Sequence, residues 1–220
     1  MKSPSAKAKV KAFTLVELLV VIVVVLFLAG ILLSSPHDNH RPTTAVCMSN
    51  QKQIALGIKL WQSDNREKFP WEISLTNSGS MEAAKRGYAA DNFRTLSDYL
   101  KNPSIFVCPT DKARTAITNF ALLKNSNLSY FADIETCKNL PNSILTGDRH
   151  LQSNNKPVEL GLFIYSTNSM MNWTRELHGN LQNAMGVLSF ADGHVEQIKG
   201  PDLNSIFQRE HLATNRLCIP

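Results

Sequence analysis

The chain has 220 residues, of which 43% are apolar and 19% are charged. This composition excludes a wholly disordered protein and fits one domain with additional segments or two very small domains. The 23 basic residues outnumber the 18 acidic ones, but Lys2, Lys7, Lys9 and Lys11 all precede Phe13 in a stretch without an acid. The rest of the chain is therefore close to neutral, and the composition makes no strong case for nucleic-acid binding.

An apolar segment follows this basic leader. Residues 13–33 read FTLVELLVVIVVVLFLAGILL, interrupted only by Thr14 and Glu17. As an α-helix this segment would be about 31 Å long, enough to cross the apolar core of a bilayer. The lysines place the N-terminus in the cytoplasm and the bulk of the chain beyond the membrane. Three interpretations compete: a secretory signal peptide, a plain signal anchor, and a prepilin leader that is cut before the apolar run.

Glu17 separates these interpretations. An acid inside a membrane-spanning helix costs about 2.5–3.5 kcal/mol on insertion scales, so it usually has a partner and a role. Cleavage between Ala12 and Phe13 would make Glu17 the fifth residue. The run Ala-Phe-Thr-Leu-Val-Glu-Leu at 12–18 resembles the processing segment of type IV prepilins and pseudopilins. That family usually has Gly before the cut, and here the residue is Ala12.

The resemblance implies cleavage by a prepilin peptidase and N-methylation of Phe13. It also implies that Glu17 pairs with the N-terminal ammonium of a neighbouring subunit, since two such charges offset each other's burial. The implied protein is not an enzyme but a structural subunit of a type IV pilus-like or type II secretion pseudopilus filament. Its expected location is the bacterial inner membrane, as a single-pass protein with a periplasmic C-terminal domain. Its expected partners are the peptidase, an assembly platform and other pilin-like subunits.

The predicted organisation has four parts: a leader at 1–12, a transmembrane and assembly helix at 13–33, a linker at 34–42 and a pilin-like globular domain at 43–220. Pro36 and Pro42 bracket the linker and favour a break between helices. An amphipathic helix is predicted from Thr43 or Thr44 to about residue 64. Its predicted inward face is formed by Val46, Ile54, Ile58 and Trp61.

The remaining pattern predicts an α+β fold, with this helix packed on a small antiparallel sheet. Runs at 187–190 and 194–198 predict a hairpin, with Asp192 and Gly193 in a type I′ turn. Further strands are predicted at 143–146 and 160–165, and further helices at 93–100 and 202–210. Residues 66–92 and 109–142 look rich in loops.

The four cysteines, Cys47, Cys108, Cys137 and Cys218, form no Cys-x-x-Cys pair, which excludes zinc-ribbon and thioredoxin-like motifs. An oxidising compartment would permit two disulfides. Three pairings are possible, and spacing does not choose between them.

Three pieces of the chain resemble one prepilin-like subgroup: CMSNQKQIAL at 47–56, FVCPTD at 106–111 and VLSFADGHV at 187–195. This subgroup carries a C-terminal His-x9-Asp-Gly signature. Here the nearest upstream histidine is His178, with thirteen residues between it and Asp192. The resemblance implies a disulfide between Cys47 and Cys108.

Acids and histidines raise the question of a metal or acid–base site. The candidates are Asp148, His150, His178, Asp192 and His194, but their spacing matches no metal signature. Both local segments look like turns, where Asp and Gly are common, so no cofactor is predicted. A calcium ion held by Asp192 and Asp202 is a weaker hypothesis, because some type II secretion pseudopilins hold calcium in a C-terminal loop.

Two other functions stay open on the residues alone. The chain could be a minor tip subunit that binds a secreted substrate, a surface or DNA, although its near-neutral charge argues against DNA. It could also be a membrane-anchored enzyme using the His and Asp residues, but no Gly-x-Ser-x-Gly, P-loop or Rossmann pattern is present.

Overall fold

The computed structural model describes residues 14–33, 41–180, 183–210 and 212–220. The chain divides into two compact units, Met1–Asp38 and Asn39–Pro220. The predicted processing residues, Ala12 and Phe13, and most of the predicted linker lie outside the described residues.

The first unit contains α1, at Leu15–Leu33. The large apolar side chains from Leu15 to Leu28 are exposed on every side of the helix, from 49% at Val24 to 79% at Leu15. No helix among the described residues meets the length and apolar character that crossing a membrane requires. The membrane span proposed at 13–33 therefore stays a prediction.

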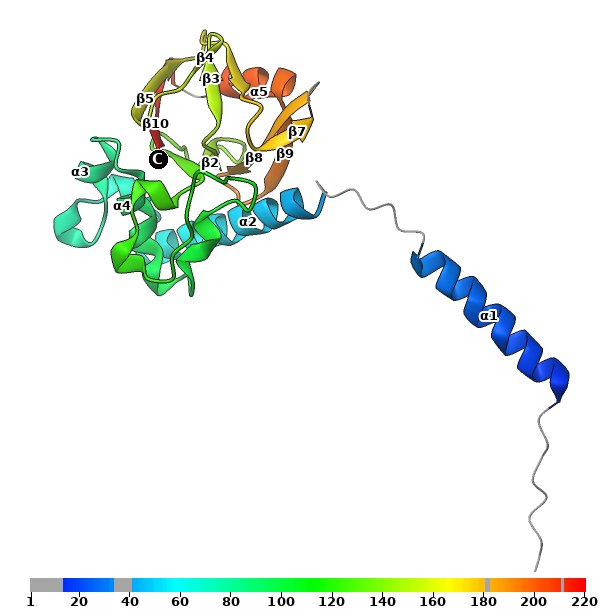
Figure 1. Ribbon diagram of the computed structural model, residues 1–220. Coiled ribbons are helices and arrows are strands. Elements are labelled where there is room, and N and C mark those ends of the chain that lie inside the picture. Colours follow the sequence, from blue (N-terminus) through cyan, green and yellow to red (C-terminus); the bar gives the residue numbers. More distant parts are fainter. Residues whose placement is uncertain (1–13, 34–40, 181–182, 211) are drawn as a thin grey trace, which may run out of the picture. The chain divides into compact units, whose positions relative to one another are not determined.

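The second unit is α+β (Figure 1). Its α-helices are α2 Arg41–Asp64, α3 Met81–Ala84, α4 Ala89–Arg94 and α5 Gly200–Phe207. Short 3₁₀ helices lie at Pro70–Glu72, Leu75–Asn77, Thr95–Asp98, Pro103–Phe106, Phe120–Leu122 and Asn125–Asn127. The strands are β1 Tyr130–Asp133, β2 Ile144–Asp148, β3 Leu151–Ser153, β4 Lys156–Pro157, β5 Gly161–Ser166, β6 Met171–Trp173, β7 His178–Asn180, β8 Asn183–Phe190, β9 Val195–Lys199 and β10 Thr214–Ile219.

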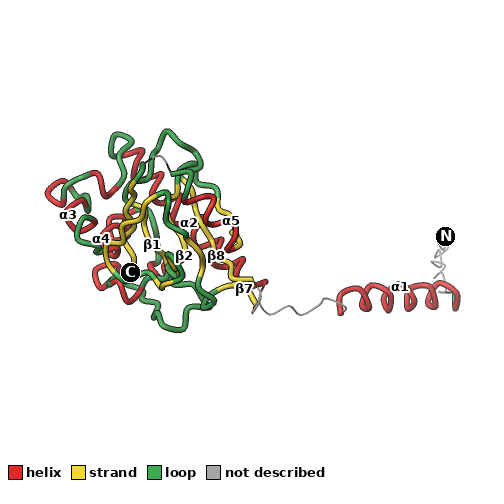
Figure 2. The backbone as a smooth tube through the Cα atoms, turned by 90° about the horizontal axis from the view of Figure 1, so that it is seen from above, coloured by secondary structure: helices red, strands yellow, loops and turns green. Residues whose placement is uncertain are grey.

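The main sheet is antiparallel, with the order β5-β10-β1-β2-β8-β7 and with β9 also paired to β8. A second sheet has the order β4-β3-β6. Figure 2 shows β1, β2 and β8 running through the middle of the unit. The antiparallel character is as predicted, but the main sheet has seven strands and is larger than the small sheet expected.

Both faces of the main sheet are covered. Tyr130 and Ala132 of β1 join the core that contains α2, whereas Phe131, between them, joins the core that contains α5. Figure 1 shows α2 and α5 on opposite sides of the sheet. All residues of β1 and β2 are consequently buried, as in sheets that are packed on both faces.

Helix α2 begins two residues before its predicted start, so Arg41 and Pro42 belong to it and not to a linker. Proline is tolerated there because a backbone N–H in the first turn of a helix would have no carbonyl partner within the helix. The buried face includes Cys47, Ile54 and Ile58, but Val46 is 45% exposed. Placing Val46 on the inward face was wrong, because the buried stripe runs through the neighbouring residue, one 100° step around the helix.

Other elements differ from their predictions in extent. The hairpin of β8 and β9 and the strands β2 and β5 occur where expected, and α5 occupies 200–207 instead of 202–210. The helix predicted at 93–100 begins earlier, as α4, and continues as a 3₁₀ turn. The short strands β3, β4, β6 and β7 were not predicted, and neither were β1 and β10. The central residues of β1 and β10 are buried toward both cores, so they lack the alternation by which strands are recognised.

We expect Gly186→Ala to lower the free energy of unfolding by about 1–3 kcal/mol, because it overpacks a filled core. A Cβ at this position of β8 would lie 2.6 Å from the ring of Trp173. That ring is fixed by a 2.9 Å hydrogen bond from its Nε1 to the Ile198 carbonyl. Thermal or urea unfolding measures the effect. The control is Glu196→Ala on β9, whose side chain is exposed; equal stability of the two variants would contradict the packing argument.

Candidate functional site

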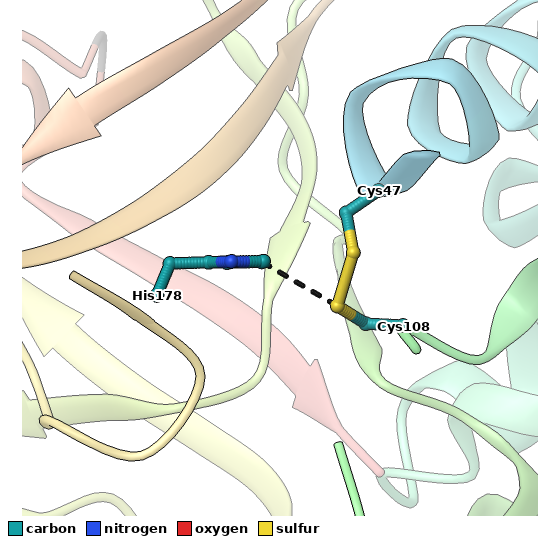
Figure 3. A group of neighbouring side chains, drawn as sticks. All are labelled: Cys47, Cys108 and His178. Atoms are coloured by element: carbon teal, nitrogen blue, oxygen red, sulfur yellow. Dashed lines mark hydrogen bonds between the residues drawn. A yellow bond between two sulfur atoms is a disulfide. The ribbon is translucent and has the colours of Figure 1, made fainter. Parts of the chain in front are cut away.

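The candidate site in the second unit is a buried contact between a disulfide sulfur and a histidine ring. Cys47, on the second turn of α2, is joined by a disulfide to Cys108, in the segment after the 3₁₀ helix at 103–106. His178 of β7 places its Nε2 3.4 Å from the Cys108 sulfur (Figure 3). All three residues are buried, so this group lies within the protein and not on its surface.

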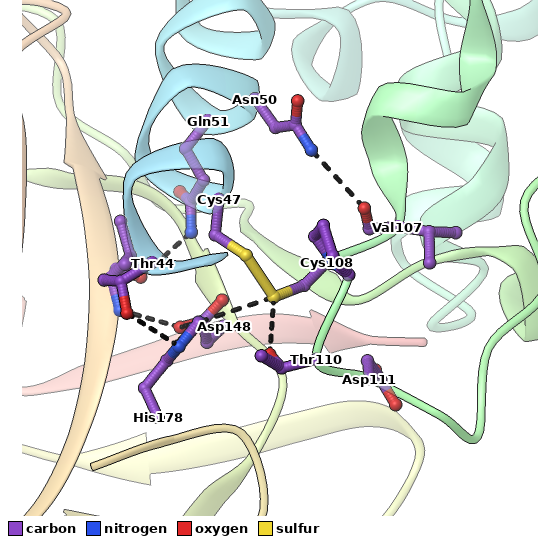
Figure 4. Close-up of a disulfide and its surroundings, with 12 residues drawn as sticks. Thr44, Cys47, Asn50, Gln51, Val107, Cys108, Thr110, Asp111, Asp148 and His178 are labelled. Atoms are coloured by element: carbon purple, nitrogen blue, oxygen red, sulfur yellow. Dashed lines mark hydrogen bonds and ion pairs between the residues drawn. A yellow bond between two sulfur atoms is a disulfide. The ribbon is translucent and has the colours of Figure 1, made fainter. Parts of the chain in front are cut away.

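The His178 ring is held from both sides. Its Nδ1 lies 3.3 Å from the Thr44 hydroxyl, one turn before Cys47 on α2. Its Nε2 lies 3.5 Å from the Asp148 carboxylate at the end of β2 (Figure 4). A hydrogen bond from Nδ1–H to the hydroxyl would leave the Nε2 lone pair facing the sulfur and the carboxylate.

Asp148 is buried and incompletely hydrogen-bonded. Its Oδ2 accepts a 2.8 Å hydrogen bond from the Val187 N–H. Its Oδ1 has no hydrogen-bond partner among the described residues. A buried polar atom without a partner costs about 1–3 kcal/mol and calls for an explanation.

Burial shifts both ionisable groups toward their neutral forms. It raises the pKa of Asp148 to about 7, although the Val187 hydrogen bond acts in the opposite direction. It lowers the pKa of His178 to about 4, and nearby His150 adds to this effect. At neutral pH His178 is therefore an uncharged imidazole, the form that can accept a hydrogen bond or a metal ion.

A second polar group lies beside this one. Arg149 donates two hydrogen bonds to Asp111, of 2.8 and 3.0 Å, in a bidentate pair. His150 lies 3.7 Å from the same carboxylate and 2.5 Å from Glu176. Burial by itself would raise the pKa of Asp111, but His150 and Arg149 outweigh it and hold that pKa well below its usual value.

The β8–β9 turn holds the other predicted residues. Gly193 has a φ of 89° and donates its N–H to the Phe190 carbonyl, whereas Asp192 is not among the described non-glycine residues with positive φ. The predicted type I′ turn is therefore wrong, because it needs positive φ at both central residues. The Asp192 carboxylate instead accepts a 2.8 Å hydrogen bond from the His194 N–H and contacts the His194 ring.

Two lysines of α2 tether this turn. Lys52 donates a 2.6 Å hydrogen bond to the Gly193 carbonyl, and Lys59 donates a 3.1 Å bond to the Asp192 carbonyl. The turn thus helps to fix α2 on the sheet. The sequence suggested that these acids and histidines could form one cluster, but the structure divides them into two groups. Asp148, His150 and His178 are buried, whereas Asp192 and His194 lie in this turn.

Among the described residues, one group of cysteine, histidine and carboxylate ligand atoms is close enough to hold a metal ion, and it consists of Cys47, Cys108 and His178. Neither Asp192 nor Asp202, the calcium candidates, belongs to it, and nothing else in the described residues supports that hypothesis. Sequence reasoning did not foresee the contact between His178 and the disulfide, because it joins α2, a loop and β7. The remaining cysteines, Cys137 and Cys218, are free thiols.

The start of α1 shows a second local arrangement. The Glu17 carboxylate accepts hydrogen bonds from the Thr14 N–H, at 2.9 Å, and from the Thr14 hydroxyl, at 2.7 Å. The Thr14 hydroxyl in turn accepts a 3.3 Å bond from the Glu17 N–H. This reciprocal pattern is a capping box, which satisfies backbone donors that have no partner at a helix start. Within a single chain Glu17 therefore caps α1.

Comparison with known proteins gives one match. The family model for the prokaryotic N-terminal methylation motif matches residues 7–33 of the sequence. The match supports a type IV pilin-like protein that is processed by a prepilin peptidase, a class that is usually structural. No curated protein and no solved structure matches the chain. The matched segment lies within the first unit and includes Glu17.

We predict that Asp148 and His178 contribute opposite pH dependences to stability. Because the pKa of Asp148 is raised by folding, its contribution to the free energy of unfolding is full below the usual pKa of 3.8. That contribution is lost as the pH rises to about 7. Because the pKa of His178 is lowered by folding, its contribution to the free energy of unfolding is full above the usual pKa of 6.5. That contribution is lost as the pH falls to about 4. The two slopes largely cancel between about pH 4 and 6.5.

Single substitutions should expose each slope. Over this range, stability should rise with pH in Asp148→Asn and fall with pH in His178→Gln, each by up to about 1.4 kcal/mol per pH unit. Urea unfolding of the full-length chain in detergent at several pH values measures this. If both variants keep the pH dependence of the wild type, the assigned protonation states are wrong.

Proposed function

We propose that the protein is a structural subunit of a pilin-like filament, of the type IV pilus or type II secretion pseudopilus kind, anchored in the inner membrane before assembly. The observation that carries the proposal is the methylation-motif match at residues 7–33, which ends where α1 ends. A prepilin peptidase would cut between Ala12 and Phe13 and leave Phe13 as the methylated N-terminus.

The exposed surface of α1 supports assembly. A helix that is apolar all round needs apolar surroundings, either lipid or other protein. The apolar side chains from Leu15 to Leu28 remain about half exposed or more within the described chain. In the proposed mechanism the α1 helices of many subunits pack together in the filament core, and the globular units face outward.

Glu17 has two roles in this mechanism, in sequence. In the single chain it caps the start of α1 through Thr14. In the filament it would meet the Phe13 ammonium of a neighbouring subunit. A buried carboxylate without a partner is costly, whereas a paired one is stabilised by its counter-charge, so this contact would set the register between subunits.

The mature N-terminus tests processing. We expect mass spectrometry of the protein from cells with prepilin peptidase to show a chain that begins at N-methyl-Phe13. Ala12→Gly should be processed at least as fast as the wild type, because Gly is the usual residue there. A mature protein that retains residues 1–12 in the presence of an active peptidase would falsify the proposal.

A pair of substitutions separates the two roles of Glu17. Glu17→Gln keeps a side chain that can form a capping box but removes the charge, and we expect normal processing and a loss of filament assembly. Thr14→Ala removes the cap, at a cost of about 1 kcal/mol, but keeps the carboxylate, and we expect assembly to continue. Sheared-filament yield measures both variants. Assembly by Glu17→Gln at the wild-type level would remove the ion pair from the mechanism.

A further inference from the structure

We propose that Cys47, Cys108, His178 and Asp148 form a binding site for a thiophilic divalent metal ion of the zinc class when the disulfide is reduced. The disulfide form and the metal form would be two alternative cross-links at the same place in the globular unit. The proposal is independent of the filament function.

The chemistry of the four groups fits such an ion. Zinc in proteins is bound by thiolates, imidazole nitrogens and carboxylates, and structural sites usually have four ligands. The two sulfurs and a ring nitrogen of His178 all lie within 4.8 Å of one another. The Asp148 carboxylate, 3.5 Å from the His178 Nε2, lies outside this group while the disulfide is closed and would supply the fourth ligand once the sulfurs have moved. Figure 4 shows these side chains converging from α2, a loop, β2 and β7.

Two of the observed separations, both from the His178 Nε2, are those of ligands around one tetrahedral ion. Ligand atoms about 2.0–2.3 Å from a tetrahedral centre lie about 3.3–3.8 Å from one another. The distance from the His178 Nε2 to the Cys108 sulfur is 3.4 Å, and the distance to the Asp148 Oδ2 is 3.5 Å. With the disulfide open, rotation about the Cα–Cβ bonds of Cys47 and Cys108 would move the sulfurs apart to that spacing.

Two further observations point to a ligand. The buried Asp148 Oδ1 has no hydrogen-bond partner among the described residues, which is unexpected for a carboxylate used only as a structural acceptor. The Thr44 hydroxyl contacts the Nδ1 of His178. Metal-binding histidines almost always have such an outer contact, which orients the ring and leaves the other nitrogen to bind the ion.

Conversion of the disulfide form into the metal form takes two steps. A dithiol reductant gives two electrons and two protons to the Cys47–Cys108 bond, which becomes two thiols while the reductant forms its own disulfide. The divalent ion then displaces the two thiol protons and forms two metal–sulfur bonds. Both sulfurs are fully buried, so the ion enters as the chain folds with its thiols reduced.

Cobalt(II) tests the site in the full-length chain, purified and refolded in detergent with a phosphine reductant. We expect one cobalt ion per chain, with a thiolate-to-cobalt charge-transfer band and the visible bands of a tetrahedral site, and displacement by zinc. The oxidised chain should show neither band. A reduced chain that binds no more cobalt than the Cys47→Ser/Cys108→Ser variant would overturn the proposal.

Substitutions of the other two ligands distinguish this site from adventitious binding by two thiols. Asp148→Asn keeps the shape of the side chain and an acceptor for the Val187 N–H, so it should preserve the fold. We expect it, and His178→Ala, to weaken zinc affinity by at least about tenfold. Control variants His194→Ala and Cys137→Ser should bind as the wild type does. Unchanged affinity in both ligand variants would mean that the four-ligand site does not exist.

Discussion

The docking of α2 on the central sheet depends on a buried amide as well as on apolar packing. The Gln51 side chain donates a 2.9 Å hydrogen bond to the Val187 carbonyl and accepts one of 2.9 Å from the Thr146 hydroxyl. These bonds join the helix to β8 and β2 and satisfy a polar group that is wholly buried. Because a buried amide needs partners at fixed positions, this contact specifies one rotation of α2 over the sheet. The apolar residues that follow, Ile54 and Ile58, then enter the core.

That rotation also positions the sulfur–imidazole group. Cys47 lies one turn before Gln51 on the same face, so fixing Gln51 directs the sulfur toward Cys108 and His178. Val187 donates its N–H to Asp148 and accepts a hydrogen bond from Gln51 at its carbonyl. One residue of β8 therefore connects the helix to the buried acid. The neighbouring acid, Asp111, has its own counter-charge in Arg149. Asp148 has none of comparable strength among the described residues, which is why burial dominates its protonation.

The two units meet the need for burial in different ways. The globular unit covers both faces of its main sheet with residues of its own chain. Helix α1 leaves the apolar side chains from Leu15 to Leu28 exposed, and in the proposed assembly lipid or other subunits would cover them. This division suits a filament subunit, in which one segment supplies contacts between copies and the other presents a stable surface. The capping box at Thr14 and Glu17 lets α1 begin in a defined way before any partner is present.

The sequence by itself determined the features that depend on local pattern. Hydrophobic runs, periodicity and nearby turn residues predicted the methylation segment, the end of α2 near residue 64, the β8–β9 hairpin and the strands β2 and β5. The tertiary structure confirms the predicted inward side of α2 at Ile54, Ile58 and Trp61 but replaces Val46 by Cys47. It also brings Cys47 close to His178. It also revealed β1 and β10, whose two-sided burial removes the alternation that marks a strand. These features depend on contacts between segments far apart in the sequence, where side-chain identity does not report distance.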